Sequence, residues 1–415
     1  MRSLSKCYRT RDLGLGIRRE KAKTKKETEY GNVQDYTLRA SRVYTLPMNA
    51  VDVVDQDGLA TLAAALDGRP WIALDTEFLR VRTYYPRLCL LQVHDGATTW
   101  LVDAPACGSL EPLRGVFFDP GVKKVLHSAR QDLETLFGAL GDVPRSVWDT
   151  QIAAALLGHG LQTGYATLVE SLTGRHLPKA HTRADWCRRP LPPELREYAV
   201  DDVVDLAIVF EMLEARLAAE GRLEWLNEEC ARLTEPALYR NAPEDAWRGH
   251  GAGAHLPPDA QHRLRALLVW RETVAQSRDL PRAWIVPDSA LFAIARTSPE
   301  NADALAAVAE IPEPFVRRYA PAVLRVLRES QVAGAAAIWE AGERLSPEER
   351  HRVQDLLAFL KRVADKNHVA PELLATRRDA ECVVRGRSDV RLSSGWRREL
   401  VGDLSAWGSS TTSGK

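Results

Sequence analysis

The feature that most constrains the fold is a change in sequence pattern near residue 215 of this 415-residue chain. Before that point, short apolar runs bounded by turn-forming residues alternate with helical patterns. Two of these runs, residues 88–93 and 98–102, flank an Asp-Gly pair that is typical of a β-hairpin. After it, strand signals fade and helical patterns interrupted by prolines take over. The pattern predicts an α/β domain with a mixed sheet, followed by two small all-helical domains.

Five segments follow from these patterns and from the charge distribution. Residues 1–29 carry ten Lys and Arg against four Asp and Glu, without an apolar period. We expect a basic, disordered extension, and the alternative is an arm that contacts nucleic acid. The expected segments are an extension at 1–47, an α/β domain at 48–218, helical domains at 255–333 and 346–408, and a disordered tail at 409–415.

Composition excludes several classes of protein. No apolar run is long enough to span a bilayer, so we expect no membrane contact. The six cysteines contain no C-x-x-C pair, which argues against a zinc ribbon and a disulfide framework and predicts a reducing cytoplasm. Beyond residue 29 the chain has 46 basic and 52 acidic residues, so any grip on nucleic acid must come from local patches.

A pair of carboxylates closes the first apolar run of the α/β domain. Residues 71–75 read as a buried strand, with Asp75 and Glu77 at its end. The two-residue period of a strand places both side chains on the same side. Neighbouring carboxylates repel each other, and a divalent cation between them would remove the repulsion. The alternative is a strand-end turn with two solvated acids.

Two further acids occur in helical segments. Tyr198 and Asp202 lie four residues apart on a helix predicted at 194–217, so they share one face, although Asp201 and Asp205 lie close by. Asp132 opens a helix after the apolar run 122–126. An acid in a first helical turn is also favoured by the helix dipole alone, so Asp132 by itself is a weak signal.

Taken in order along the chain, these acids and Tyr198 form a pattern that resembles the motifs of the DEDD exonucleases, in the branch that bears a tyrosine. The sequence around them, at residues 72–86, 125–133, 148–153 and 182–206, resembles ribonuclease D over about residues 48–215. The resemblance implies an RNase H-like exonuclease domain and 3′–5′ hydrolysis of RNA to 5′-mononucleotides. It also implies two ions, Mg²⁺ or Mn²⁺: Asp75 would bridge them, Glu77 and Asp202 would hold the first and Asp132 the second. Tyr198 would orient or help to deprotonate the attacking water.

The same resemblance implies tRNA precursors as substrate and a monomer without a nucleotide cofactor. Residues that mix charge with aromatic rings, as single-strand binders do, or that stand in the resembling segments, are candidate substrate contacts. They are Arg80, Arg82, Tyr84, Tyr85, Gln92, His127, Lys179 and Arg183. The alternative is packed loops with ordinary surface arginines and a structural His127, and we expect Trp148 to belong to the core.

The helical half resembles the helicase-and-RNase-D C-terminal (HRDC) domain at residues 267–295. We expect Trp270, Leu280, Trp284 and Ile285 to be core residues there, and Asp288 to cap a helix. Residues 346–408 resemble a second, divergent copy.

Two other functions remain open at this point: a 3′–5′ exonuclease that acts on DNA, and a non-catalytic RNA-binding protein. RNA and DNA differ by the 2′-hydroxyl, whose contacts no sequence pattern reveals. The set of four acids with Tyr198 argues against a non-catalytic protein. A helicase is excluded because the chain has no G-x-x-x-x-G-K-[ST] loop.

Overall fold

The computed structural model describes residues 50–177, 184–331, 334, 336–339, 345–387 and 389–408. The expected extension at 1–47 and tail at 409–415 lie outside these residues. Within the described part, no helix combines the length and the hydropathy that a bilayer crossing requires.

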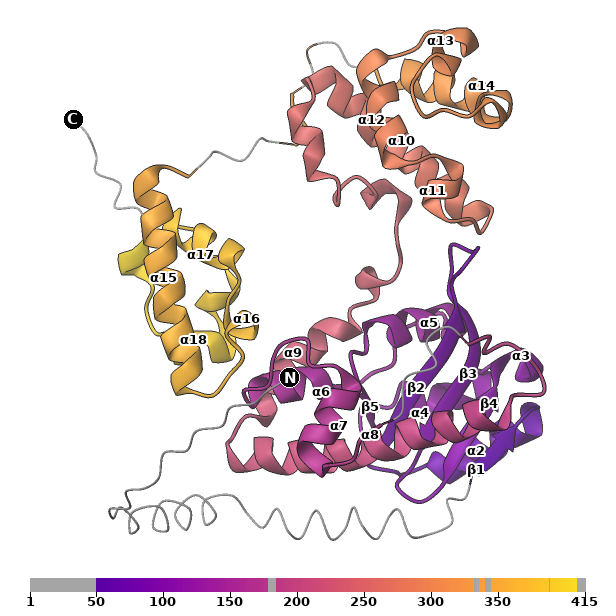
Figure 1. Ribbon diagram of the computed structural model, residues 1–415, viewed down its shortest axis with the longest axis vertical. Coiled ribbons are helices and arrows are strands. Elements are labelled where there is room, and N and C mark those ends of the chain that lie inside the picture. The colour runs from indigo at the N-terminus through magenta and orange to yellow at the C-terminus, as the bar shows by residue number, and fades with distance from the viewer. Residues whose placement is uncertain are drawn as a thin grey trace, which may run out of the picture. The chain divides into compact units, whose positions relative to one another are not determined.

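A six-stranded mixed sheet forms the centre of the first domain (Figure 1). Its strands are β1 (Ala50–Val53), β2 (Trp71–Leu79), β3 (Arg87–His94), β4 (Thr99–Asp103), β5 (Lys123–Leu126) and β6 (Val147–Asp149). The order is β1-β4-β3-β2-β5-β6; β3 is antiparallel to both neighbours and the other pairs are parallel. The predicted hairpin joins β3 to β4, and Asp95 accepts hydrogen bonds from the amides of Ala97 and Thr98 in its turn.

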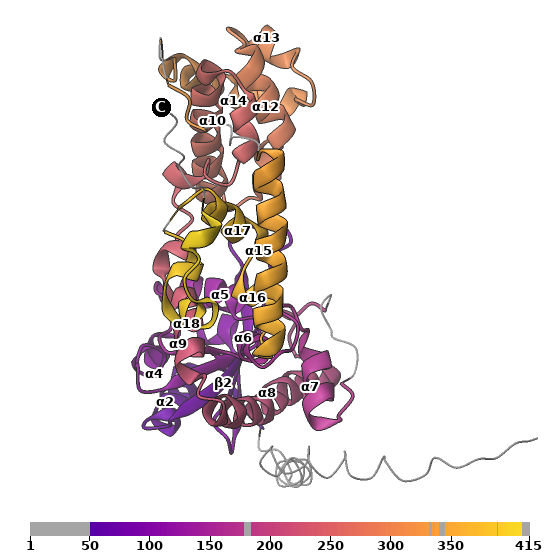
Figure 2. The ribbon, with the colours of Figure 1, turned by 90° about the vertical axis from the view of Figure 1, so that its left-hand side faces the viewer.

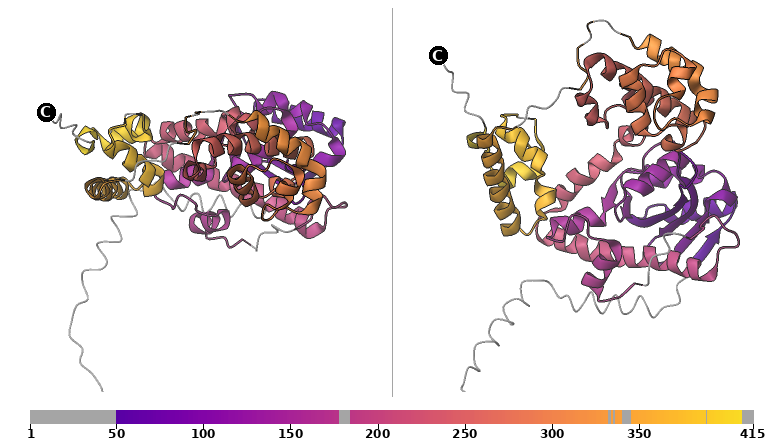
Figure 3. Two further views of the ribbon diagram at one scale, coloured as in Figure 1. Left: turned by 90° about the horizontal axis from the view of Figure 1, so that it is seen from above. Right: turned by 45° about the horizontal axis from the view of Figure 1, so that its top comes forward.

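Helices cover both faces of this sheet. On one face, α2 (Gln56–Leu66) and α5 (Arg130–Leu140) bury their leucines against Ile72, Leu74 and Leu91. On the other face, the long helix α8 (Pro193–Ala219) crosses β2, β3, β4 and β5, as Figures 1 and 3 show. β3 and β4 in the middle of the sheet are therefore buried on both sides, which explains their nearly continuous apolar sequences, whereas the edge strand β1 has exposed residues.

Shorter helices connect the strands. They are α3 (Ala104–Cys107), α4 (Arg114–Phe117), α6 (Thr150–Leu156), α7 (Tyr165–Thr173) and α9 (Leu223–Ala231). Helices α5 and α7 end at Gly141 and Gly174, whose φ angles of 78° and 74° lie in the left-handed region that glycine adopts without strain. Gly174 turns the chain towards Arg175, which contacts α8 at the site described below.

The structure differs from the expectation at three strands. β1 and β6 were not expected, because runs of four and three residues are too short to show a period. β2 does not end at Asp75 but continues to Leu79, since its antiparallel pairing with β3 extends over its second half. Asp75 and Glu77 are therefore strand residues and not turn residues.

Cys89 and Cys187 form a disulfide, with Cα atoms 4.9 Å apart. The cysteine spacing led us to expect none, and for this pair the expectation is wrong. The two residues are separated by 98 positions, and only the packing of the segment before α8 against β3 brings them together. Spacing along the chain carries no information on such a contact.

The next region is a helical bundle of α10 (Pro258–Ser277), α11 (Arg282–Ile285), α12 (Asp288–Thr297), α13 (Ala302–Ala306) and α14 (Glu313–Glu329). Ile285 is buried, and Trp270 and Leu280 are partly buried against the core. The prediction for Trp284 is wrong, because 58% of its surface is exposed. Asp288 is not an N-cap either: it begins α12 after Pro287, and its carboxylate accepts a hydrogen bond from Arg271 at 2.5 Å.

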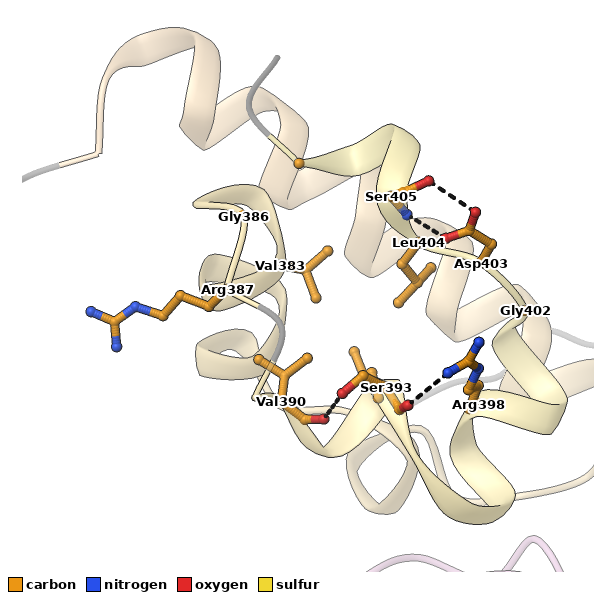
Figure 4. Close-up of a pocket in the computed structure, with 12 residues that line it drawn as sticks. Val383, Gly386, Arg387, Val390, Ser393, Arg398, Gly402, Asp403, Leu404 and Ser405 are labelled. Carbon is orange, nitrogen blue, oxygen red and sulfur yellow. Dashed lines mark hydrogen bonds between the residues drawn. The ribbon is translucent and has the colours of Figure 1, made fainter. Parts of the chain in front are cut away.

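A second helical module, best seen in Figure 2, consists of α15 (Pro347–Lys366), α16 (Pro371–Leu374), α17 (Arg377–Val384) and α18 (Gly395–Val401). Ser346 and Glu349 form a capping box at the start of α15. The module contains a cavity of about 400 Å³ (Figure 4). Polar groups on its wall bond to one another: Ser405 donates to Asp403, and Arg398 donates to the carbonyl of Ser393. These groups therefore stabilise the fold of the module.

A buried ion pair joins this module to α9. Arg397 is fully buried and donates to Glu229, with Nη2 2.9 Å from Oε2, and also to the carbonyls of Leu373 and Leu374. The indole of Trp396 donates to the same carboxylate at 3.0 Å. Hydrogen bonds from Arg397 and Trp396 thus replace the water that the Glu229 carboxylate loses on burial, as a buried charge requires.

Candidate active site

β2 and α8 bring three of the predicted acids together. Asp75 and Glu77 lie two residues apart on β2, and Asp202 lies on α8, which crosses that strand. One carboxylate oxygen from each of the three residues lies within 4.8 Å of the other two. These residues come from two segments more than 120 positions apart, so the fold builds the cluster.

The fourth acid, Asp132, enters from the first turn of α5, next to β2. Its Oδ1 accepts a hydrogen bond of 2.5 Å from the hydroxyl of Thr76, the residue between Asp75 and Glu77. The charge of Asp75 acts on Asp132, although Asp132 lies outside the group of three. Asp132 therefore lies close enough to Asp75 for the two charges to interact.

The helical spacing of Tyr198 and Asp202 gives the contact that was expected, since the phenol donates a hydrogen bond to the carboxylate. The acids on either side of Asp202 have a different partner. Arg175 donates to Asp201 at 2.6 Å and to Asp205 at 2.9 Å. Asp201 and Asp205 are thus engaged in ion pairs, whereas Asp202 faces the other acids of the cluster.

Burial and mutual repulsion make the ionised cluster costly. Burial raises the pKa of Asp75 to about 6. Burial, together with the charges of Asp75, Asp202 and Asp132, raises the pKa of Glu77 to about 9. Burial and the charge of Asp75 raise the pKa of Asp202 to about 8. The charged neighbours that raise the pKa values of Glu77 and Asp202 are carboxylates. A bound divalent cation would offset their negative charge and lower these pKa values.

The donor set fits such a cation. Carboxylate oxygens are hard ligands, which Mg²⁺ and Mn²⁺ prefer, whereas a soft metal would require sulfur. Asp75, Glu77 and Asp202 could hold one ion, and Asp132 with Asp75 a second. Phosphodiester hydrolysis by paired divalent ions uses carboxylates arranged in this manner.

The candidate substrate contacts after β2 are not all at the cluster. Arg80 pairs with Glu134 on α5, with Nη1 2.9 Å from Oε2. Tyr84 is buried against the helical bundle, where its hydroxyl donates to Glu272 and accepts from Arg282. Arg82 and Tyr85 are exposed, and Lys179 and Arg183 lie outside the described residues.

The remaining two candidates are His127, which is partly buried, and Gln92. His127 bonds to the hydroxyl of Thr150 at 2.9 Å and to the carbonyl of Thr163 at 3.2 Å, so both ring nitrogens are engaged inside the protein. Burial lowers its pKa, which keeps the ring neutral. Gln92 is fully buried on β3. Neither side chain is open to a substrate in this structure.

Three residues around the acids were not anticipated from the sequence. Arg175 binds the neighbours of Asp202, Thr76 binds Asp132, and the hydroxyl of Tyr165 donates to the backbone carbonyl of Asp202. Thr76 could have been found, because it stands between the two strand acids. Arg175 and Tyr165 follow no period and become visible only through the packing of α7 against α8.

Known proteins with similar sequences now place the chain. Residues 51–218 match the family model of a 3′–5′ exonuclease, and residues 260–327 match that of an HRDC domain. Ribonuclease D of Granulibacter bethesdensis is 37% identical over 365 residues, covering 84% of this chain and 90% of that protein. Ribonuclease D of Acidiphilium cryptum is 38% identical over 357 residues, with the same coverage of both chains. The chain belongs to the ribonuclease D family.

Solved structures agree with this assignment. The crystal structure of Escherichia coli RNase D, described as an exoribonuclease involved in structured RNA processing, has a TM-score of 0.78 and 31% identity. It covers 85% of this chain and 96% of its own. The catalytic core of RRP6 from Trypanosoma brucei follows at a TM-score of 0.53 and 25% identity, covering 69% and 80%. The predictions of an exoribonuclease-type hydrolase and of a mixed-sheet exonuclease domain with an HRDC domain are confirmed.

Proposed function

We propose that this ribonuclease D family member removes 5′-mononucleotides one at a time from the 3′ end of RNA, with two divalent ions, in tRNA 3′ maturation. The observation that carries the proposal is the meeting of Asp75, Glu77 and Asp202 within 4.8 Å. Family membership supports the direction of hydrolysis. The printed description of Escherichia coli RNase D, structured RNA processing, supports the class of substrate.

The four acids divide between two ions, Mg²⁺ or Mn²⁺. Asp75 would contribute to both, Glu77 and Asp202 would hold the first, and Asp132 would hold the second. Bound ions would neutralise the scissile phosphate and lower the pKa of the attacking water. The chain itself contributes the spacing of the ligands, because α5 and α8 pack against β2 from the two faces of the sheet.

Tyr198 orients the attacking water in this proposal. Burial and the charge of Asp202 raise the pKa of the phenol far above neutrality, so the hydroxyl keeps its proton at physiological pH. A protonated phenol positions the water by a hydrogen bond and is a poor base. The structure therefore favours the orienting role over deprotonation.

RNA reaches the acids past exposed side chains in this proposal. Arg82 and Tyr85 are exposed on the segment after β2, and Lys179 and Arg183 precede α8 in the sequence. A cation beside an aromatic ring suits a single strand, whose phosphates and bases it contacts together. We also propose the division into domains at 48–218, 255–333 and 346–408, with the last as a second HRDC-like copy and the whole chain acting as a monomer.

A tRNA precursor labelled at its 3′ end in one reaction and at its 5′ end in another tests the proposal. With Mg²⁺, 3′-labelled RNA should release labelled mononucleotide at once, while 5′-labelled RNA shortens stepwise. EDTA and the Asp202→Asn variant should abolish release, and Glu197→Gln, an exposed acid on the same helix, should not. Release in EDTA, or a wild-type rate for Asp202→Asn, overturns the two-ion assignment. Faster hydrolysis of a DNA strand of the same sequence overturns the RNA assignment.

A further inference from the structure

Gln92 stands out because its side chain is buried without a partner. It is 0% exposed, and neither its amide nitrogen nor its amide oxygen has a hydrogen-bond partner among the described residues. Leaving a buried polar group unpaired costs about 1–3 kcal/mol. A methionine or leucine would fill the same space without that cost. Packing alone therefore gives no reason for an amide at this position.

The sheet places Gln92 directly beside a proposed metal ligand. In the antiparallel register of β2 and β3, Gln92 is the partner of Asp75. Residues directly opposite each other on antiparallel strands point to the same face, with Cβ atoms about 4.5–5.5 Å apart. An amide side chain spans that distance. Gln92 is thus within reach of the Asp75 carboxylate from the neighbouring strand.

Helix α8, which carries Tyr198 and Asp202, packs over the face of the sheet on which Gln92 lies. Its neighbours on the same face, Leu90 on β3 and Leu101 on β4, pack against Ala199 and Val200 of α8. These residues lie in the same turns as Tyr198 and Asp202. Gln92 therefore lies between the sheet and α8, beneath the acid cluster, and is closed to a substrate.

Two other acids of the cluster already have a side-chain donor. Thr76 donates to Asp132, and Tyr198 donates to Asp202. For Asp75, the described residues supply a backbone amide, that of Thr76, and no side-chain donor. Ligands of a metal depend on such hydrogen bonds for their orientation. Among the described residues, Asp75 and Glu77 are thus the two acids of the cluster without a side-chain donor, and of these Asp75 is the one that lies directly opposite Gln92.

We propose that Gln92 is a positioning residue for Asp75: with a divalent cation bound, its amide N–H would donate to the Asp75 carboxylate and hold the rotamer in which that carboxylate is a ligand. The inference rests on the metal site under Proposed function. A neutral amide suits this task better than a lysine or arginine, because it orients the carboxylate without replacing the charge of an ion. This role takes the place of the substrate contact that we predicted for Gln92 from the sequence.

The test is calorimetric titration of the full chain with Mn²⁺ alone, combined with thermal unfolding in EDTA. Gln92→Met keeps the volume and removes the hydrogen bond. Leu91→Met is the matched control, a buried residue on the same strand that faces the opposite layer. We expect Gln92→Met to weaken Mn²⁺ affinity about tenfold or more, the range for residues that orient metal ligands. Its Tm in EDTA should equal or exceed that of the wild type, and Leu91→Met should bind Mn²⁺ normally.

The outcomes separate the two proposals. Wild-type affinity in Gln92→Met, with binding lost in Asp75→Asn, overturns the role of Gln92 and leaves the metal site standing. Equal losses of affinity and Tm in both methionine variants indicate a general packing effect and also overturn it. No Mn²⁺ binding by the wild type overturns both. As a further readout, raising Mn²⁺ should restore the kcat of Gln92→Met towards the wild-type value.

Discussion

The Glu229 carboxylate and the acid cluster of Asp75, Glu77 and Asp202 have opposite surroundings. Around Glu229, burial by itself would raise the pKa, but the hydrogen bonds and charge of Arg397 and the indole of Trp396 outweigh it and lower the pKa. Around Asp75, Glu77 and Asp202, burial raises the pKa and the neighbouring carboxylates raise it further. One group carries its own counter-charge, whereas the other lacks one.

The presence or absence of a counter-charge distinguishes the structural site around Glu229 from the proposed functional site around Asp75. A buried acid with a complete set of donors stabilises one arrangement of α9 and α18. A cluster of acids that repel one another destabilises the chain until a cation binds. Relief of this repulsion would favour the binding of a divalent ion at the second site. The predictions below compare the two sites, beginning with the largest effect.

Replacing Asp75 by Asn should lower kcat by about 10³-fold or more. The substitution removes the ligand proposed to touch both ions, and several kcal/mol of transition-state stabilisation correspond to about this factor. Single-turnover hydrolysis of a 3′-labelled RNA at saturating Mg²⁺ measures it. Glu229→Gln, the equivalent change at the structural site, should leave kcat within about threefold while the protein stays folded. Equal losses in both variants would break the comparison.

Arg397→Met should lower the free energy of unfolding by about 3 kcal/mol, because it leaves the Glu229 charge buried without its main partner. Urea denaturation at pH 7 measures the change. The increase in stability that Mg²⁺ gives should be the same as in the wild type, since the acid cluster is intact. A loss of less than about 1 kcal/mol would show that the ion pair adds little stability.

Tyr198→Phe should lower kcat by about 10²-fold even at saturating Mg²⁺, and it should weaken Mg²⁺ affinity by about tenfold because Asp202 loses its side-chain donor. The phenol orients the water, and positioned groups of this kind contribute about that factor. The ligands Asp75, Glu77 and Asp202 remain in place. Rate against Mg²⁺ concentration separates the two effects, because the midpoint reports the lost donor to Asp202 and the rate at saturation reports the orientation of the water. A wild-type rate at saturating Mg²⁺ would contradict the orienting role.

The stability of the two sites should respond to pH in opposite directions. Asp75 and Asp202, with pKa values raised to about 6 and about 8, bind more protons in the folded state. In EDTA their contribution is complete below about pH 4 and is lost as pH rises from 4 to about 6 for Asp75 and from 4 to about 8 for Asp202, by up to about 1.4 kcal/mol per pH unit for each group. Glu229, whose pKa is lowered, contributes at neutral pH and loses that contribution as pH falls.

Denaturation curves from pH 5 to 9, in EDTA and in Mg²⁺, check this prediction. Stability in EDTA should fall with pH, and Mg²⁺ should flatten the curve. Asp202→Asn should show a shallower fall than the wild type. A steady rise in stability from pH 6 to 9 in EDTA would contradict the account of the acid cluster.

Much of the site could be predicted because its signals are local. The two-residue spacing of Asp75 and Glu77 and the helical spacing of Tyr198 and Asp202 are read directly from the chain. Long-range contacts were not predictable. The pairing of Cys89 with Cys187 and of Arg175 with Asp201 depends on which segments pack together. Trp284 was misplaced because a large apolar residue predicts burial only on average.

The central claim, that the acids form an uncompensated metal site, is tested most directly by thermal unfolding of the wild type and Asp202→Asn at pH 8. In EDTA, the variant should have the higher Tm, because it removes one of the repelling charges. In Mg²⁺, the wild type should gain several degrees and the variant much less. A lower Tm for Asp202→Asn in EDTA, together with an undiminished gain from Mg²⁺, would contradict the claim.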